Sequence, residues 1–554
     1  MPEVNQNPKK KLDVWMPLLF ALVLAVGMIV GTQLKKTPQV IIKTNDSSQV
    51  LDYSKLGQGR IEDLIRFVEA RYVDDVNSEE LVEQAIKNIL NQLDPHSNYI
   101  KAADLKKVNE ELQGNFEGVG IEFMVLDDTI MIVSALSGGP SEKAGIMAGD
   151  KIVEIGDSLA VGENIDPTKL VNKLRGEQGT EVKIGILRGN EKDVKYFTVT
   201  RDEIPMHSVD VGYMLDKQTG YIKINRFSAT TTTEFMEKLR ILVEEKGLKD
   251  LVIDLRQNPG GYLQEATKIL SQFFKESGKL LVYTEGRTVS RNDYESTGQN
   301  FFDVEKIAVL IDEGSASASE IMAGAFQDWD RGVIVGRRSF GKGLVQEQYE
   351  LKDGSALRLT VARYYTPTNR SIQRAYDDKS AYDSDVIQRY NGGELLNKDS
   401  IEISDTTQYL TLIENRVVYG GGGITPDIFV PIDTTHWNDH YVSLRQVVPQ
   451  FVYRYKESQQ NEFSEMTLEN FRHDFDVDDE LLEEFLEYAA EKGVNRDFNE
   501  EFIINDITKK FLKARIGRSL FQDEGFFTIW NDEDEVVKAA LNALRSANPL
   551  TYSK

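Results

Sequence analysis

The segment that most constrains the fold of this 554-residue chain runs from residue 307 to residue 346. It begins with an apolar run, Ile307 to Ile311, that is typical of a buried strand, and residues 319–329 carry apolar side chains at helical spacing. The glycine and serines between these runs therefore lie on a strand-to-helix turn. Such a turn lifts a side chain out of the sheet and directs the free N–H groups of the first helical turn toward a bound group.

A lysine between glycines follows the second apolar run, residues 332–335, in the sequence Phe340-Gly341-Lys342-Gly343. The glycines allow close backbone approach and leave little room for water around the amine, and desolvation lowers the pKa of a lysine. A neutral lysine can take the proton of a serine, as in Ser-Lys variants of the serine-protease triad. These residues alone leave the role open, because a lysine in a loop is usually a solvated charge and three serines compete as nucleophile: Ser315, Ser317 and Ser319.

The run GSASASEIMAGAFQD followed by VGRRSFGKGLVQ resembles the active-site signature of the C-terminal processing peptidases, also called tail-specific proteases. The resemblance implies that Ser317, the middle serine of the run, is the nucleophile and that Lys342 is the general base. It also implies that Gln346 orients the lysine. These three residues are the expected catalytic set.

An α/β pattern begins after Met206, with a strand expected at 220–225, a helix at 232–245 and a strand at 250–255. The segment DLRQNPGG follows, and a glycine N–H there can turn toward substrate because no Cβ blocks the turn. The family resemblance implies an oxyanion hole made by Ala318 N–H and by one of two glycines, Gly260 or Gly261. Residues 206–433 are thus expected to form a serine peptidase core with the crotonase/ClpP-like ββα architecture.

Residues 114–205 are dense in alternating strand patterns and resemble a PDZ domain. In such a domain, backbone N–H groups of a loop hold a chain-terminal carboxylate while the tail adds as a strand to an open sheet edge. A helix at residues 167–174 is expected to form the other wall of the groove. Arg175 follows it and, by the family pattern, responds to bound peptide. The expected peptide-binding loop consists of Gly118, Val119, Gly120 and Ile121.

Residues 14–34 carry no charged side chain and are long enough to cross a bilayer as a helix. A cleaved signal peptide is the alternative, but the run is long and has no evident small-x-small site before Lys35. We therefore expect residues 1–36 to be a retained transmembrane anchor in the bacterial inner membrane, with the catalytic part in the periplasm. Cleavage would instead give a protein secreted to the periplasm. Residues 37–113 are expected to hold a tether and an N-terminal helical region.

Two further regions have no clear counterpart in the family pattern. Residues 374–420 form a polar, acidic stretch that is expected to be a surface-exposed insertion. Residues 434–554 have helical periodicity and should pack together or onto the core. This helical C-terminal extension is interpreted either as a stabilising cap or as a region for homodimer formation or adaptor docking.

The composition of the chain excludes several classes of binding partner and cofactor. A formal net charge of −25 argues against nucleic acid, and the absence of cysteine excludes disulfides and thiolate metal sites. His436 and His440 lie four residues apart, but no third metal ligand is evident near them. His96 lies in a turn and is expected to be structural. Neither a metal nor another cofactor is therefore expected.

The sequence therefore predicts a mixed α/β protein that acts as a serine endopeptidase on protein substrates with apolar C-terminal tails. Two alternatives stay open. One is a non-catalytic PDZ scaffold that binds protein C-termini. The other is a crotonase-like acyl-CoA enzyme, for which an export anchor and a tail-binding module make little sense.

Overall fold

The computed structural model describes residues 59–126, 128–162, 166–189, 191–402 and 405–551. The described chain divides between Leu81 and Val82 into two units. The first unit contains α2 (Arg60–Arg71) and the start of α3 (Ser78–Asn91). Within the described ranges no helix has the length and apolar character needed to cross a membrane. The predicted anchor, residues 1–36, lies outside these ranges.

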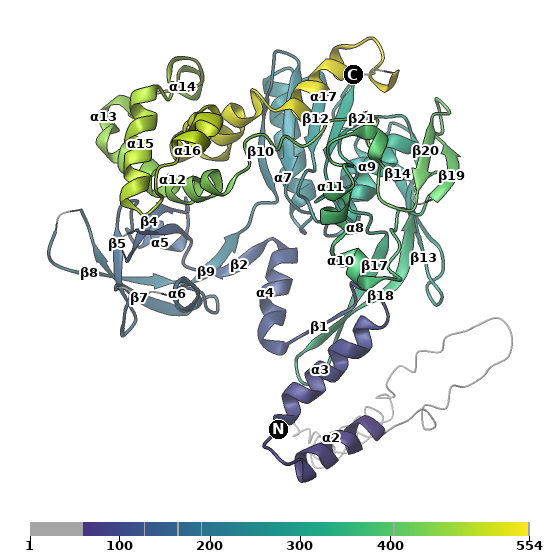
Figure 1. The fold of residues 1–554 in the computed structure, drawn as a ribbon, viewed down its shortest axis with the longest axis horizontal. Helices are drawn as coiled ribbons and strands as arrows, with labels where there is room; N and C mark the ends of the chain where they lie inside the picture. Colours follow the sequence, from purple (N-terminus) through teal and green to yellow (C-terminus); the bar gives the residue numbers. More distant parts are fainter. Residues whose placement is uncertain (1–58, 127, 163–165, 190, 403–404, 552–554) are drawn as a thin grey trace, which may run out of the picture. The chain divides into compact units, whose positions relative to one another are not determined.

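A six-stranded sheet forms the centre of the second unit (Figure 1). Its first two strands pair antiparallel and all the other neighbours pair parallel. Parallel strands buried on both faces read as continuous apolar runs, which is why IAVLI and VIV occur here. In spatial order the strands are β10 (Val209–Met214), β11 (Thr219–Ile224), β12 (Asp250–Asp254), β15 (Ile307–Ile311), β16 (Val333–Gly336) and β21 (Ile428–Phe429).

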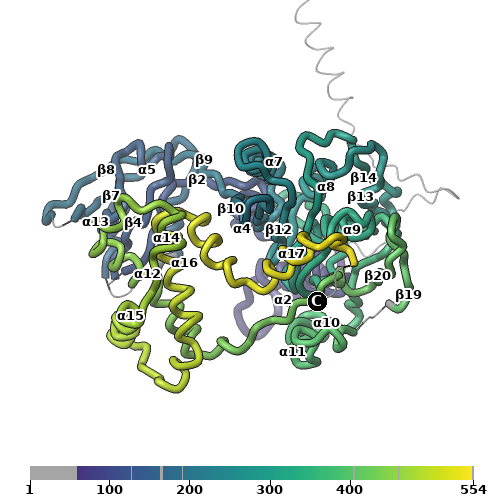
Figure 2. The backbone as a smooth tube through the Cα atoms, turned by 90° about the horizontal axis from the view of Figure 1, so that it is seen from above, coloured from purple at the N-terminus to yellow at the C-terminus, as the bar shows by residue number. Residues whose placement is uncertain are grey.

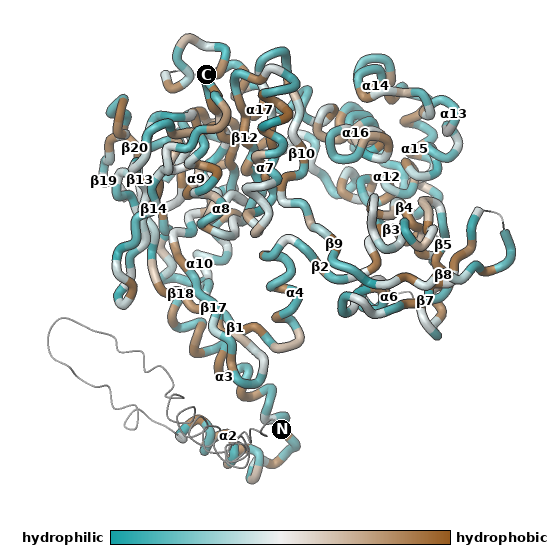
Figure 3. Tube along the Cα trace, turned by 180° about the vertical axis from the view of Figure 1, so that it is seen from behind, coloured by the Kyte–Doolittle hydropathy of each residue, from teal (hydrophilic) through white to brown (hydrophobic). Residues whose placement is uncertain are grey.

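Helices from opposite ends of the sequence cover the two faces of this sheet. One face packs against α7 (Thr231–Arg240, continued by the π-turn Ile241–Glu245), α8 (Leu263–Ser271) and α9 (Ala318–Asp328). The other face packs against α17 (Glu535–Arg545), and Figure 3 shows hydrophobic stretches on both β12 and α17. The end of the predicted C-terminal extension is therefore part of the peptidase core.

A second, five-stranded sheet adjoins the lysine turn, and two of its members, β1 and β18, are distant in sequence but paired. The insertion after it contains α10 (Lys379–Asp383), α11 (Asp385–Asn391), a 3₁₀ turn (Lys398–Ser400) and the hairpin β19 (Asp405–Leu410) and β20 (Val417–Gly420). The strands of the sheet are β1 (Asn98–Ile100), β13 (Ser277–Glu285), β14 (Asn292–Thr297), β17 (Leu344–Glu350) and β18 (Ala356–Tyr365).

The prediction that residues 374–420 are surface-exposed is wrong for several of them. Tyr382, Arg389 and Leu395 are all buried. The Arg374 guanidinium lies 4.0 Å from the ring centre of Phe340 and 3.8 Å from that of Tyr382, so the insertion packs directly behind the lysine turn. The polar sequence of this stretch predicted exposure, but its arginines are buried against aromatic rings, carbonyls and carboxylates.

The predicted PDZ region forms a β-sheet with its own core. Helix α4 (Ala102–Gln113) precedes this region in the chain. Strand β2 (Asn115–Gly118) at its start pairs antiparallel with β9 (Asp202–Pro205) at its end. Strand β3 lies at the edge of its sheet, next to α6 (Pro167–Leu174), as a tail-binding groove requires. Its elements are β3 (Ile121–Leu126), β4 (Thr129–Ala135), α5 (Pro140–Lys143), β5 (Lys151–Ile155), β6 (Ser158–Leu159), β7 (Glu181–Leu187) and β8 (Lys195–Thr200).

The rest of the C-terminal extension forms a helical region (Figure 2). This region has its own hydrophobic core. Its last helix leaves helical geometry at Phe521 and Gln522, where Gly517 and Gly525 are in such close contact that a Cβ on Gly525 would lie 2.3 Å from Gly517 O. Only glycine fits there. The helices are α12 (Asp439–Ser458), α13 (Gln460–Phe463), α14 (Leu468–Asp474), α15 (Asp479–Glu491) and α16 (Phe498–Asn531), and a 3₁₀ turn (Pro549–Thr551) follows α17.

Candidate active site

Ser317 is the N-cap of α9 and has φ 56° and ψ −112°. A residue with a Cβ adopts such backbone angles only where the surrounding structure constrains it. Ser317 lies at the end of the turn that joins β15 to α9. The neighbouring serines are used structurally: Ser315 Oγ donates to Leu255 O at 2.8 Å, and Ser319 Oγ donates to Asn258 O at 3.0 Å. Both of these are fully buried, whereas Ser317 is partly exposed. Ser317 is therefore the most exposed of the three candidate serines.

Glu320, one turn into α9, joins the serine turn to the lysine turn. Its buried carboxylate accepts hydrogen bonds from Ser317 N at 2.8 Å, Gly341 N at 2.6 Å, Lys342 N at 2.9 Å and Ser339 Oγ at 2.6 Å. Burial raises its pKa to about 7, although the four donors oppose that shift. Sequence reasoning missed Glu320. The Ser-x-x-Glu spacing of a capping box was the available signal.

Lys342 is held by a chain of contacts that crosses the sequence. Its Nζ donates to Gln346 Oε1 at 3.1 Å, and Gln346 Nε2 donates to His96 O at 2.5 Å. Burial lowers the pKa of Lys342, and the nearby positive charge of Arg358 lowers it further. The structure therefore brings Gln346 to Lys342, as the resemblance implied.

Ser317 and Lys342 share neighbours but are not hydrogen-bonded to each other in the part of the chain that the structure describes. The Tyr364 hydroxyl lies 3.1 Å from Ser317 O and 2.6 Å from Lys342 O, so it links the two backbones, as Glu320 does. In unliganded enzymes such catalytic contacts often tighten only when substrate binds. The amine is meanwhile held by Gln346.

The DLRQNPGG turn lies against the serine turn. A Cβ placed on Gly260 would be 2.8 Å from Ser317 Cβ and 2.9 Å from Ala318 N, and Gly260 has φ 96°. The Gly260 N–H donates to Asn258 Oδ1 at 2.8 Å. Among the described residues, the N–H groups of Ala318 and Gly261 have no acceptor, so they are available to a bound group.

His96 lies at the site as a structural residue. Its carbonyl accepts from Gln346, and its ring Nε2 lies 2.6 Å from the Tyr382 hydroxyl. Burial, together with the charge of Lys342, lowers its pKa to about 4, so the ring is neutral at physiological pH. Contacts over 250 and 286 residues of sequence cannot be read from local patterns.

The PDZ region contains an apolar pocket that includes the predicted peptide-binding loop. Arg175 lies at this pocket, 4.6 Å from the centre of the Phe116 ring, and its Nη1 donates to Glu110 Oε2 of α4 at 2.8 Å. The pocket is lined by Phe116, Gly118, Val119, Gly120, Ile121, Phe123, Val171, Leu174 and Arg175.

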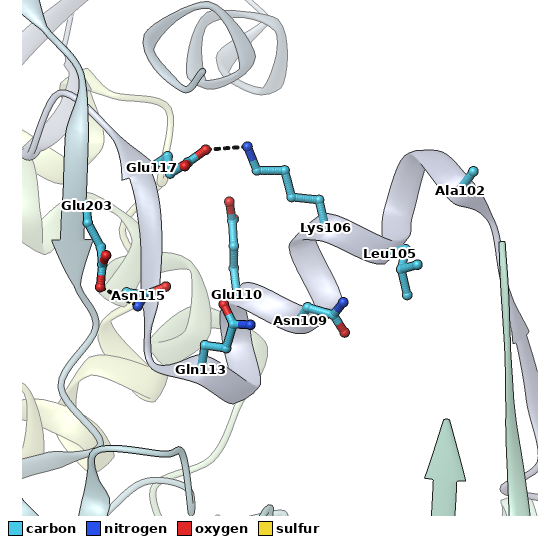
Figure 4. Close-up of a pocket in the computed structure, with 9 residues that line it drawn as sticks. All are labelled: Ala102, Leu105, Lys106, Asn109, Glu110, Gln113, Asn115, Glu117 and Glu203. Carbon is cyan, nitrogen blue, oxygen red and sulfur yellow. Dashed lines mark hydrogen bonds and ion pairs between the residues drawn. The ribbon is translucent and has the colours of Figure 1, made fainter. Parts of the chain in front are cut away.

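Helix α4 contacts both the PDZ pocket and the peptidase core. Figure 4 shows Lys106 and Glu110 projecting from α4 toward β2, where Lys106 pairs with Glu117. Farther round the same helix, Asn109 Oδ1 accepts from Gln348 Nε2 at 3.0 Å. Gln348 lies on β17, two residues after Gln346, so α4 connects the two sites physically.

Comparison with known proteins identifies the class. Residues 218–378 match peptidase family S41, residues 118–199 match the PDZ domain, and residues 440–522 match a family of unknown function (DUF8443). A probable CtpA-like serine protease of Staphylococcus aureus (strain MRSA252) is 32% identical over 373 residues, which are 67% of this chain and 73% of the relative. The chain belongs to peptidase family S41.

Two further proteins are similar. A carboxy-terminal-processing protease of Bartonella bacilliformis (strain ATCC 35685 / KC583 / Herrer 020/F12,63) is 35% identical over 356 residues, 63% of this chain and 78% of the relative. A solved photosystem II D1 C-terminal processing protease is 27% identical and covers 56% of this chain and 84% of its own, with a TM-score of 0.32. The protein is a serine-type peptidase with a PDZ domain, so the predicted fold class and enzyme class are confirmed over the scaffold alternative.

Peptidase activity is expected to rise with pH. Lys342, the expected general base, can accept a proton only when it is neutral, and burial lowers its pKa below the ordinary lysine value of 10.5. Glu320, with a pKa of about 7, adds a loss on the acid side, because its protonation weakens the bonds that hold the lysine turn. We expect kcat/KM for a substrate without titratable side chains to increase at least about tenfold from pH 6 to pH 9. A flat profile, or one that falls over this range, would contradict a lysine base.

Proposed function

We propose that the protein is an endopeptidase that selects substrates by their C-terminal tails and cuts them with Ser317 and Lys342. The observation that carries this proposal is the carboxylate of Glu320, which binds the backbone N–H groups of both residues and so keeps the two turns together. The pocket at the edge of the PDZ sheet supports tail recognition, because its walls are apolar and a glycine-rich loop begins it.

The chemistry follows from these groups. Lys342 Nζ takes the proton from Ser317 Oγ as Oγ bonds to the carbonyl carbon, and the ammonium then gives the proton to the leaving amine as the C–N bond breaks. Water attacks the acyl-enzyme, Lys342 accepts its proton, and proton return to Oγ releases the acid. Gln346 orients the amine between these steps.

The developing oxyanion is bound by Ala318 N–H and Gly261 N–H in this proposal. We favour Gly261 over Gly260 because the Gly260 N–H is already donated to Asn258. Such donors contribute about 2.7 to 4 kcal/mol each to transition-state stabilisation.

We further propose that residues 14–34 anchor the protein in the bacterial inner membrane and that the peptidase faces the periplasm. The uncharged run of 21 residues, flanked by lysines, supports an anchor. Homodimer formation or adaptor docking through the C-terminal helices is part of the same proposal, motivated by the apolar spacing and acidic surface of that region.

Tail-dependent cleavage by the full chain tests this function. A carrier protein with an apolar C-terminal tail should be cut, and the same carrier with two terminal aspartates or a C-terminal amide should be cut at least about tenfold more slowly, because the pocket offers N–H groups and apolar walls. Val171→Glu should remove this preference, whereas Lys169→Ala on the exposed side of α6 should keep it. Equal cutting of all carriers would reject tail selection.

Arg175 is predicted to couple the pocket to the active site. A tail in the pocket lies beside the Arg175 side chain, so its binding changes the contact of the guanidinium with Glu110 of α4. Arg175→Ala should therefore lower kcat about tenfold or more while changing the Kd of a tail peptide less than threefold. Peptide titration and steady-state kinetics measure the two effects, and equal losses of both would reject the coupling.

A further inference from the structure

We propose that the helical region of residues 439–531 forms an outer wall of the tail-binding groove and limits strand pairing to about the last four residues of a tail. The inference rests on the proposed tail recognition and adds a role for a region that matches a family of unknown function. The contact that carries it is a hydrogen bond from Gln450 of α12 to the backbone of β3.

The free groups of β3 can be assigned from its register. Phe123 lies opposite Ile132 of β4, and both backbone groups of Ile132 bond away from β3, to Asp150 O and from Gly149 N. Residues opposite each other in an antiparallel pair point their groups the same way, toward each other or apart. The groups of Phe123 therefore face the open edge, and so do those of Val125, two residues along the strand.

Gln450 already occupies this edge at Val125. Its Nε2 donates to Val125 O at 3.2 Å, and its Oε1 lies 3.4 Å from the Tyr488 hydroxyl of α15, which holds the amide in place. One more contact joins the same surfaces, because a Cβ on Gly149 would lie 3.4 Å from the Tyr453 hydroxyl. The charge of Glu122 on β3 also favours the charged form of Arg515 of α16, although no ion pair joins these two described residues. Figures 1 and 2, seen from directions 90° apart, both show α12 near β4.

The length limit follows from the direction of the tail. The loop before Ile121 holds the terminal carboxylate, so an added tail runs antiparallel along β3 away from that loop. Its last residue meets Ile121, the residue two before meets Phe123, and the residue four before meets Val125. Because Gln450 already donates to Val125 O, strand pairing stops before this residue, and the upstream part of the tail leaves the edge of the PDZ sheet.

Tail peptides of two lengths test the inference. The full chain carrying Ser317→Ala is titrated with labelled peptides of four and eight residues that share the same last four residues. We expect their Kd values to agree within twofold. Gln450→Ala opens the edge, and the eight-residue peptide should then bind about fivefold to tenfold more tightly than the four-residue one, since about 1 kcal/mol per added hydrogen bond corresponds to such a factor.

Gln446→Ala, one turn earlier on α12 and exposed, is the matched control and should leave the two Kd values equal. Two outcomes would overturn the inference. In one, the eight-residue peptide binds several-fold more tightly than the four-residue peptide to the protein that retains Gln450. In the other, the two Kd values stay equal in Gln450→Ala although its thermal unfolding is unchanged. Failure of both peptides to bind, with no effect of Val171→Glu, would instead reject the proposed tail recognition on which the inference rests.

Discussion

Replacement of Ser317 by alanine is expected to lower kcat/KM by about 10⁴-fold or more, with little change in tail binding or thermal stability. The hydroxyl is the only part removed, and among the hydrogen bonds of the described residues Ser317 is held through its backbone, by Glu320 and Tyr364. Lys342→Ala should cause a loss of similar size, because the serine then has no base.

Three comparisons sharpen this prediction. The double variant should be no slower than either single variant, since the two side chains act as a unit. Lys342→Arg should also be inactive, because a guanidinium does not give up its proton in proteins. Ser319→Ala, which removes a hydroxyl used structurally, should keep activity within about tenfold. Persistent cleavage by purified Ser317→Ala or Lys342→Ala protein would exclude the pair.

Glu320→Ala is expected to have the next largest effect, a loss of about 10²-fold or more in kcat together with a lower melting temperature. The change leaves four donors without this acceptor, two of them buried and two part-buried, and each buried unsatisfied group costs about 1–3 kcal/mol. We regard Glu320 as a positioning residue, because its carboxylate is fully buried and accepts hydrogen bonds from the backbones of Ser317 and Lys342. The Kd of a tail peptide should therefore stay within about twofold of the wild-type value.

A conservative variant separates positioning from simple destabilisation. Glu320→Gln keeps an acceptor and the side-chain volume, so it should recover part of the stability and should remove the titration near pH 7 from the activity profile. Glu313 lies on the turn between β15 and α9, and its carboxylate pairs with Arg337. Glu313→Gln should therefore leave kcat nearly unchanged. Loss of stability in Glu320→Ala without loss of kcat would contradict the positioning role.

Local patterns predicted the elements around the active site well. The strand Ile307–Ile311 agrees with its predicted bounds, and α9 begins one residue earlier than predicted. Helix α6 likewise matches residues 167–174. These elements were predictable because a buried parallel strand and an amphipathic helix each leave a periodic apolar signal within a few residues.

The insertion and the C-terminal extension were harder to interpret. The periodicity of 434–554 showed helices but not their destinations, and the structure divides them between a separate helical region and α17 on the core sheet. A chain that ends near Pro431 would lose α17 and expose the apolar face that it covers. The buried arginines of the insertion gave a polar pattern, because burial of a paired cation leaves no apolar signature.

By itself, the sequence determined the peptidase signature around Ser317 and Lys342, the PDZ-like module and the helical character of the C-terminal region, since each is written in neighbouring residues. Only the tertiary structure decided which of the three serines is partly exposed, that Glu320 joins the serine turn to the lysine turn, that Gln346 bonds to His96, and that Gln450 reaches β3. Those contacts join side chains to groups up to several hundred residues away, and such pairings arise from packing of whole elements, which no local periodicity records.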